Sequence, residues 1–225
     1  MKSFLQRLLS FVLLISPLSL SAAESQYWTS MQITSGINDQ FSLYGELINR
    51  YSDEKNEFTT RSNRLGLVYK INSDLTYTIM IENRDTDSDA NDEIRFINQL
   101  QKKFNFDVVS LAARLRLENR EFSNTPVFAL RGRILLRADF DQYELYHLKP
   151  FVSYEYFNIL NDTIGRPSGS TEHRNQIGFT TSVKAINAKA EISYLARTTE
   201  RPAWQTLDKL TNTYSILNLV LKWDF

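Results

Sequence analysis

The end of the chain constrains the fold more than any other segment. In the last nine residues, apolar and aromatic side chains occupy every second position: Leu217, Leu219, Leu221, Trp223 and Phe225. Polar side chains such as Asn218 and Lys222 lie between them. Because successive side chains of a β-strand point to opposite sides, a repeat of two indicates a strand with one apolar face.

The aromatic residue at the very end adds a second meaning to this strand. A terminal strand closed by Phe225 resembles the C-terminal signal by which bacterial outer-membrane β-barrels are recognised for insertion. The residues that carry this resemblance are Leu219, Leu221, Trp223 and Phe225. It implies a transmembrane barrel that is handled by the barrel-assembly machinery during its biogenesis.

The N-terminus has the pattern of a secretory signal peptide. Lys2 and Arg7 are followed by an apolar stretch over residues 8–20, and small residues end at Ala23. The apolar stretch is shorter than the roughly 20 residues of a membrane-spanning helix. We therefore expect a cleaved signal over residues 1–23, a mature domain over residues 24–225, and export to the outer membrane of a Gram-negative bacterium.

The mature chain is predicted to consist of long strands. Alternating segments fall near residues 26–37, 41–52, 60–71, 74–85, 93–105, 107–122, 126–140, 147–158, 172–185, 187–199 and 211–225. Most have about 11 to 15 residues, whereas strands of soluble proteins average about five or six. Short turns alternate with longer polar connections, as in transmembrane barrels. The fold class is therefore all-β, a transmembrane antiparallel up-and-down β-barrel with 10–12 strands.

The number of strands is a problem in itself, because bacterial single-chain barrels usually have an even number. Eleven segments would place the two ends of the barrel domain on opposite sides of the membrane. Either segment 26–37 is not a full strand, which gives ten, or a twelfth strand lies near residues 203–207.

The charged face is assigned to the lumen and the apolar face to lipid. The mature chain has 15 Arg and 9 Lys, and the rigid fork of arginine suits pairing with carboxylates in confined space. The residues expected to line the lumen are Glu46, Arg50, Arg64, Glu82, Arg84, Arg95, Arg114, Arg116, Glu118, Arg120, Arg131, Arg133, Arg137, Glu155, Arg174, Glu191 and Arg197. Aromatic residues near strand ends, including Trp28, Phe122 and Tyr146, are expected to form interface girdles.

Four motifs resemble one known family. These are RLRLENRE at residues 114–121, LRGRILLR at 130–137, PFVSYEYF at 150–157 and HRNQIGF at 173–179. They are similar to an uncharacterised family, a domain of unknown function, that is assigned to outer-membrane β-barrels. The resemblance runs from Trp28 to Phe225 and implies fold and location without an established activity. A looser similarity, in size and in Arg-rich strands, links the chain to oligogalacturonate-specific porins.

The composition argues against several other functions. Without Lys2 and Arg7, 24 basic residues face 26 acidic ones, so the balance is not that of a nucleic-acid-binding protein. There is no Cys, and His147 and His173 are far apart, so no metal site is expected. No cofactor is expected either. A hydrolase or acyltransferase that uses His173 ranks third, because no spacing orients a nucleophile toward it.

Two functions stay open for the barrel. The leading prediction is a small porin-like channel that passes small solutes, anions among them, through an Arg/Glu-lined lumen. The alternative is a non-conducting structural barrel of the envelope, whose outer loops contact lipopolysaccharide or a partner. Side chains fill barrels of about eight strands, whereas larger barrels leave room for a channel, so the choice depends on barrel size.

Overall fold

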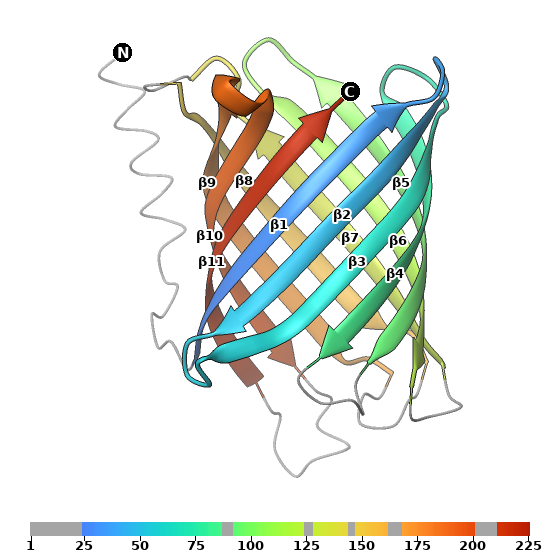
Figure 1. The fold of residues 1–225 in the computed structure, drawn as a ribbon, viewed down its shortest axis with the longest axis vertical. Helices are drawn as coiled ribbons and strands as arrows, with labels where there is room; N and C mark the ends of the chain where they lie inside the picture. The colour runs from blue at the N-terminus through green and yellow to red at the C-terminus, as the bar shows by residue number, and fades with distance from the viewer. Residues whose placement is uncertain (1–23, 87–91, 124–127, 144–146, 162–167, 201–210) are drawn as a thin grey trace.

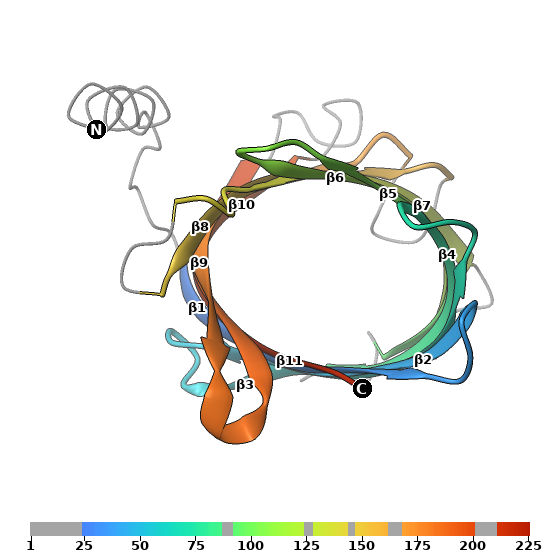
Figure 2. The same ribbon diagram turned by 90° about the horizontal axis from the view of Figure 1, so that it is seen from above.

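The chain folds into one closed barrel, whose circumference is seen end-on in Figure 2. The computed structural model describes residues 24–86, 92–123, 128–143, 147–161, 168–200 and 211–225. The strands are β1 (Glu24–Gly36), β2 (Phe41–Ser52), β3 (Glu57–Lys70), β4 (Leu75–Thr86), β5 (Glu93–Asn105), β6 (Ser110–Phe122), β7 (Phe128–Asp139), β8 (Lys149–Ile159), β9 (Thr171–Val183), β10 (Ala188–Glu200) and β11 (Thr211–Asp224). The expected all-β barrel is confirmed.

Neighbouring strands along the chain are also neighbours in the barrel. Each pair from β1–β2 to β10–β11 is antiparallel. Two turns at one end of the barrel have the same hydrogen-bond pattern. The side-chain oxygen of Asn38 accepts hydrogen bonds from the backbone amides of Gln40 and Phe41. The side-chain oxygen of Asn72 accepts hydrogen bonds from the backbone amides of Asp74 and Leu75. Such Asn turns close a hairpin within a few residues.

The barrel closes with an odd number of strands. β1 and β11 pair in parallel from Glu24↔Tyr214 to Thr34↔Asp224, and their arrowheads point the same way in Figure 1. The expectation of an even count is therefore wrong, and residues 24–36 form a full strand. The suggested twelfth strand at residues 203–207 lies outside the described residues, but β10 and β11 pair directly with each other. With a parallel pair at the seam, an odd number of strands can close the barrel, because the first and last strands then run in the same direction.

The two ends of the barrel differ. β1 begins at Glu24 at one end of the barrel, which we call the Glu24 end, and β11 leads to Phe225 at the other end, the Phe225 end. The connections at residues 37–40, 71–74, 106–109 and 184–187 lie at the Phe225 end. Strands β4, β8 and β10 end, and strands β5, β9 and β11 begin, at the Glu24 end. Among the described residues, the one helical element is a 3-10 turn at Lys184–Ile186, and no helix is long and apolar enough to cross a bilayer.

Every strand exposes apolar side chains on the outer face of the wall. Leu115 and Leu117 are 53% and 43% exposed, while Arg116 between them is 7% exposed. Exposed apolar side chains of other strands include Met31, Leu47, Leu65, Ile79, Phe96, Ile134, Ile177, Ile192 and Leu217. In a single closed sheet, side chains that alternate with this exposed face point into the barrel.

A small apolar cluster lies inside the barrel beside the seam. It contains Trp28, Leu195 and Ile216, with Tyr214 packed against it. The expectation that Trp28 belongs to an interface girdle is wrong: its ring is buried, and Arg50 stacks on it at 4.0 Å. Phe122 likewise lines an interior cavity. Tyr146 lies outside the described residues.

Candidate functional site

The charged side chains inside the barrel are the candidate functional site. All twelve arginines and five glutamates singled out above are buried or partly buried, and none is exposed. Each comes from a strand that sends its apolar side chains to the outer face. The alternation of these strands thus concentrates opposite charges in the interior, where burial favours the pairing of opposite charges.

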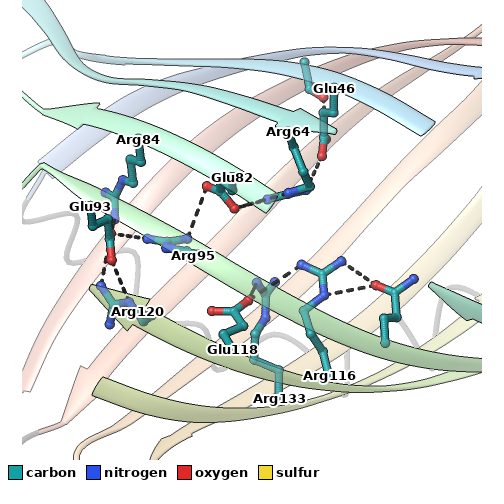
Figure 3. A network of polar contacts seen from close by, with 12 residues as sticks. Glu46, Arg64, Glu82, Arg84, Glu93, Arg95, Arg116, Glu118, Arg120 and Arg133 are labelled. Carbon is teal, nitrogen blue, oxygen red and sulfur yellow. Dashed lines mark hydrogen bonds and ion pairs between the residues drawn. The ribbon is translucent and has the colours of Figure 1, made fainter. Parts of the chain in front are cut away.

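One chain of ion pairs runs along the wall from β2 to β6 (Figure 3). It starts at Glu46, which Arg64 contacts, and Arg64 also lies 2.7 Å from Glu82. Arg95 joins Glu82, at 3.3 Å, to Glu93. Arg64, Glu82 and Arg95 each bridge two partners of opposite sign, so the row behaves as one network rather than as isolated pairs.

Glu93 is the branching point of this network. It accepts from Arg95, from Arg84 at 2.7 Å and from Arg120 Nε at 2.7 Å. Both of its carboxylate oxygens are therefore engaged, and the side chain is almost completely buried. Three guanidinium groups share this one carboxylate, which leaves a local excess of positive charge at the Glu24 end.

A second group is centred on Glu118 and Glu155. Glu118 is contacted by Arg131 and Arg133, and Arg116 lies 3.7 Å from it. Glu155 pairs with Arg133 and Arg114, both at 2.8 Å. Arg116 also donates two hydrogen bonds to Gln99. Figure 3 shows Arg116 and Arg133 side by side above Glu118.

Further ion pairs lie elsewhere in the barrel, and one of them joins strands that are not neighbours. Arg137 on β7 lies 2.8 Å from Glu191 on β10, which is three strands away in the barrel order, and Lys222 on β11 is 2.7 Å from the same carboxylate. Arg174 and Arg197 both contact Glu172. The contact between Arg137 and Glu191 reaches across the interior rather than along the wall.

Aromatic rings from β8 pack against several of the interior arginines. Phe157 is 2% exposed, and the guanidinium carbons of Arg133 and Arg174 each lie 4.3 Å from its ring centroid. Arg137 lies 3.8 Å from the ring centroid of Phe151, which is fully buried. Stacking on an aromatic face lets a desolvated guanidinium keep a favourable electrostatic contact.

A cavity of about 240 Å³ lies at the Glu24 end of the barrel. Its lining residues are Gln26, Arg50, Thr59, Thr60, Arg84, Thr86, Glu93, Arg120, Phe122 and Arg197. They come from the first residues of β1, β3 and β5 and the last residues of β2, β4, β6 and β10. The cavity is thus an inward hollow at the rim, and arginine is its main charged component.

The sequence-based prediction does not include two glutamates of the network. Glu93 and Glu172 are buried and carry some of the densest pairing in the barrel. Each lies two residues before a predicted interior arginine, Arg95 and Arg174 respectively. The repeat of two that placed those arginines inside also places both glutamates there.

The other predicted residues have separate surroundings. Leu219 and Phe225 are exposed on the outer face, Leu221 and Trp223 are half-buried on the same face, and Trp223 Nε1 donates to the carbonyl oxygen of Ile186. His173 lies on the outward phase of β9, where Nδ1 is 2.8 Å from the hydroxyl of Tyr154. Within the described ranges, no three His, Asp or Glu side chains gather closely enough to hold a metal ion. The predicted signal peptide lies outside the described residues.

These features define a closed β-barrel whose interior holds a buried network of arginines and glutamates. Residues 25–207 match the family described as "Protein of unknown function (DUF2490)", and the chain belongs to that family. No curated protein and no solved structure matches the chain.

Proposed function

We propose that this protein is an outer-membrane β-barrel with a lumen closed by side chains, which serves as a non-conducting structural component of the Gram-negative envelope. The membrane location is supported by the apolar outer face of all the strands, by strands of 11 to 14 residues and by the outward-facing aromatic end at Phe225. An outer face of this kind would be costly in water, because it exposes many large apolar side chains.

The observation that carries the closed lumen is the burial of its carboxylates. Glu82 is 2% exposed and Glu118 is 0% exposed, although both point into the barrel. On the other side, Glu155 and Glu191 are nearly as well covered. The burial of these groups by ion pairs and stacked rings supports a lumen that is closed by side chains.

In such a barrel the network would make the wall rigid and would not form a route for solutes. A buried ion pair adds little net stability against an apolar substitute, but the removal of one partner is costly. Alternative arrangements of the wall would break several pairs at once, so the network specifies one arrangement. The connections at the Glu24 end would then face outward and contact lipopolysaccharide or a partner protein.

Single-channel recording tests the proposal. The refolded chain without residues 1–23 is inserted into a planar bilayer, after its folding is verified by β-sheet circular dichroism and by altered gel mobility before heating. We expect no stable current steps. Reproducible steps of uniform size from folded protein would overturn the closed lumen.

A second candidate function is an anion-selective channel, and the excess of arginine inside the barrel favours it. Arginines on one wall would focus anions along the pore. In this case the wild type conducts, and charge reversal by Arg116→Glu or Arg133→Glu lowers the preference for anions in reversal potentials under a salt gradient. The matched control is Glu121→Lys on the outer face of β6, which should leave selectivity unchanged. Unchanged selectivity in both interior variants of a conducting protein would rule out the arginine wall as its filter.

A further inference from the structure

The cavity at the Glu24 end has an unbalanced charge. Four arginines, Arg50, Arg84, Arg120 and Arg197, line it against one glutamate, Glu93, so the net charge of its wall is +3. Glu93 is already shared by several guanidinium groups. The remaining polar lining consists of one glutamine and three threonines, which bring no negative charge. The wall therefore has a surplus of hydrogen-bond donors over charged acceptors.

Arg50 is the least compensated of these arginines. Among the described residues, no carboxylate forms an ion pair with it. Its guanidinium carbon lies over the ring of Trp28, 4.0 Å from the ring centroid. Its Nε is buried and has no hydrogen-bond partner, and the same holds for Nε of Arg84 and of Arg197. A buried guanidinium with unmet donors is costly, because desolvation is not offset by pairing.

The neighbouring contacts fix two of these groups in place. Arg84 donates to Glu93 at 2.7 Å and to Thr60 at 3.3 Å, and Arg197 lies 3.2 Å from Glu172 and stacks over Tyr214. Arg50 is held against the indole ring. Their positions are thus set before any ligand arrives, which lowers the entropic cost of binding.

We propose that this cavity is a binding site for a small oxyanion of the phosphate or sulfate type, with Arg50, Arg84 and Arg197 as the groups that hold it. Guanidinium groups bind such anions through paired N–H donors, and the buried position strengthens each contact. A cavity of about 240 Å³ has room for an anion with a few water molecules, but not for a polymer segment. The site goes beyond the proposed structural role, because a closed barrel needs no ligand. The phosphate comes either from free solution or from a phosphate group of lipopolysaccharide.

Calorimetric titration of the refolded protein with inorganic phosphate, and separately with sulfate, tests the site. We expect saturable binding that Arg50→Gln weakens at least tenfold. Arg61→Gln is the matched control, since Arg61 is an exposed arginine near the same end, on β3. Because no carboxylate in the described part of the chain pairs with Arg50, neutralisation of Arg50 should leave folding intact. Thermal unfolding checks this and supplies a second readout, because phosphate should raise the melting temperature of the wild type but not of Arg50→Gln.

A competition experiment distinguishes the two sources of phosphate. Lipopolysaccharide and its dephosphorylated form are each added before the phosphate titration. If only the phosphorylated form blocks phosphate binding, the lipid supplies the ligand; if neither blocks it, the site takes the free ion. Absence of saturable binding by the folded wild type would overturn the proposal, as would equal weakening by Arg50→Gln and Arg61→Gln. Both results are independent of conductance, so the failure of this site and that of the closed lumen are distinguishable.

Discussion

The amide nitrogen of Phe225 donates a hydrogen bond to the carbonyl oxygen of Thr34, at 2.8 Å. In return, the amide of Gly36 donates to the carbonyl oxygen of Phe225, at 2.9 Å. The last residue of the chain is thus bonded twice to β1, in the parallel ladder that closes the barrel. Its ring is 69% exposed on the outer face. Backbone and side chain of Phe225 therefore have different tasks, one in closure and the other in contact with the surroundings.

Deletion of Phe225 should impair assembly more than Phe225→Ala does. The deletion removes both seam hydrogen bonds together with the ring, whereas the substitution removes only the ring. We expect the deletion to reduce the folded fraction both in cells and in refolding into vesicles, and Phe225→Ala to reduce it in cells alone. The folded fraction is measured by gel mobility before heating. Phe106→Ala, an exposed ring at the same end of the barrel, serves as the control. Normal assembly of both Phe225 variants in cells would contradict the terminal-signal hypothesis.

The positions of the strands could be predicted from the sequence because each strand has one apolar and one polar face. The segment expected at residues 41–52 is β2, and the segment at 93–105 is β5, with the same bounds. The closure could not be predicted in this way. The repeat of two shows that residues 24–36 can be a strand, but it contains no information on the direction of a partner nearly 190 positions away. The general rule of even strand numbers favoured ten or twelve strands, whereas the barrel has eleven.

The interior residues were predictable, whereas their partners were not. The arginines of β6 and β7 face inward as their alternation implies, but which glutamate each contacts depends on the stagger of the strands. Arg137 reaches Glu191 only because the barrel brings β7 and β10 together. The positions of the Trp28 and Phe157 rings are harder still to predict, because an aromatic residue can lie at a lipid interface or stack with an arginine.

Glu118→Gln should destabilise the barrel strongly. Glu118 is fully buried and contacts Arg131 and Arg133, so the neutral amide leaves two buried guanidinium groups without their shared counter-charge. We expect a loss of about 3 kcal/mol in the free energy of unfolding. The measurement is urea-induced unfolding in lipid vesicles, followed by tryptophan fluorescence. Glu121→Gln, on the exposed face of the same strand, should change stability by less than about 0.5 kcal/mol. Equal effects of the two substitutions would argue against a buried network.

Gly178→Ala should also be destabilising, for a steric reason. A Cβ at Gly178 would lie 2.5 Å from the carbonyl oxygen of Ile192 and 2.5 Å from Cβ of Ser193, so β9 and β10 would have to move apart. We expect a loss of about 2 kcal/mol, measured by the same unfolding transition. At Gly45 the nearest atom to such a Cβ is a side-chain carbon of Leu65, at 3.9 Å, so Gly45→Ala is the control and should be tolerated. A stable Gly178→Ala variant would show that the two strands are less closely packed than the structure has them.

Phe157→Leu tests whether stacking on an aromatic ring stabilises the arginines inside the barrel. Arg133 and Arg174 lie over this ring at 4.3 Å, and Arg131 lies over it at 5.2 Å. Leucine retains most of the apolar volume but has no π face, so the variant should lose about 2 kcal/mol of unfolding free energy. Phe128→Leu, an exposed ring on the outer face of β7, is the control and should have little effect. If the loss comes from stacking, Phe157→Tyr should restore most of the stability, because it keeps the aromatic face. Failure of Phe157→Tyr to differ from Phe157→Leu would assign the effect to packing alone.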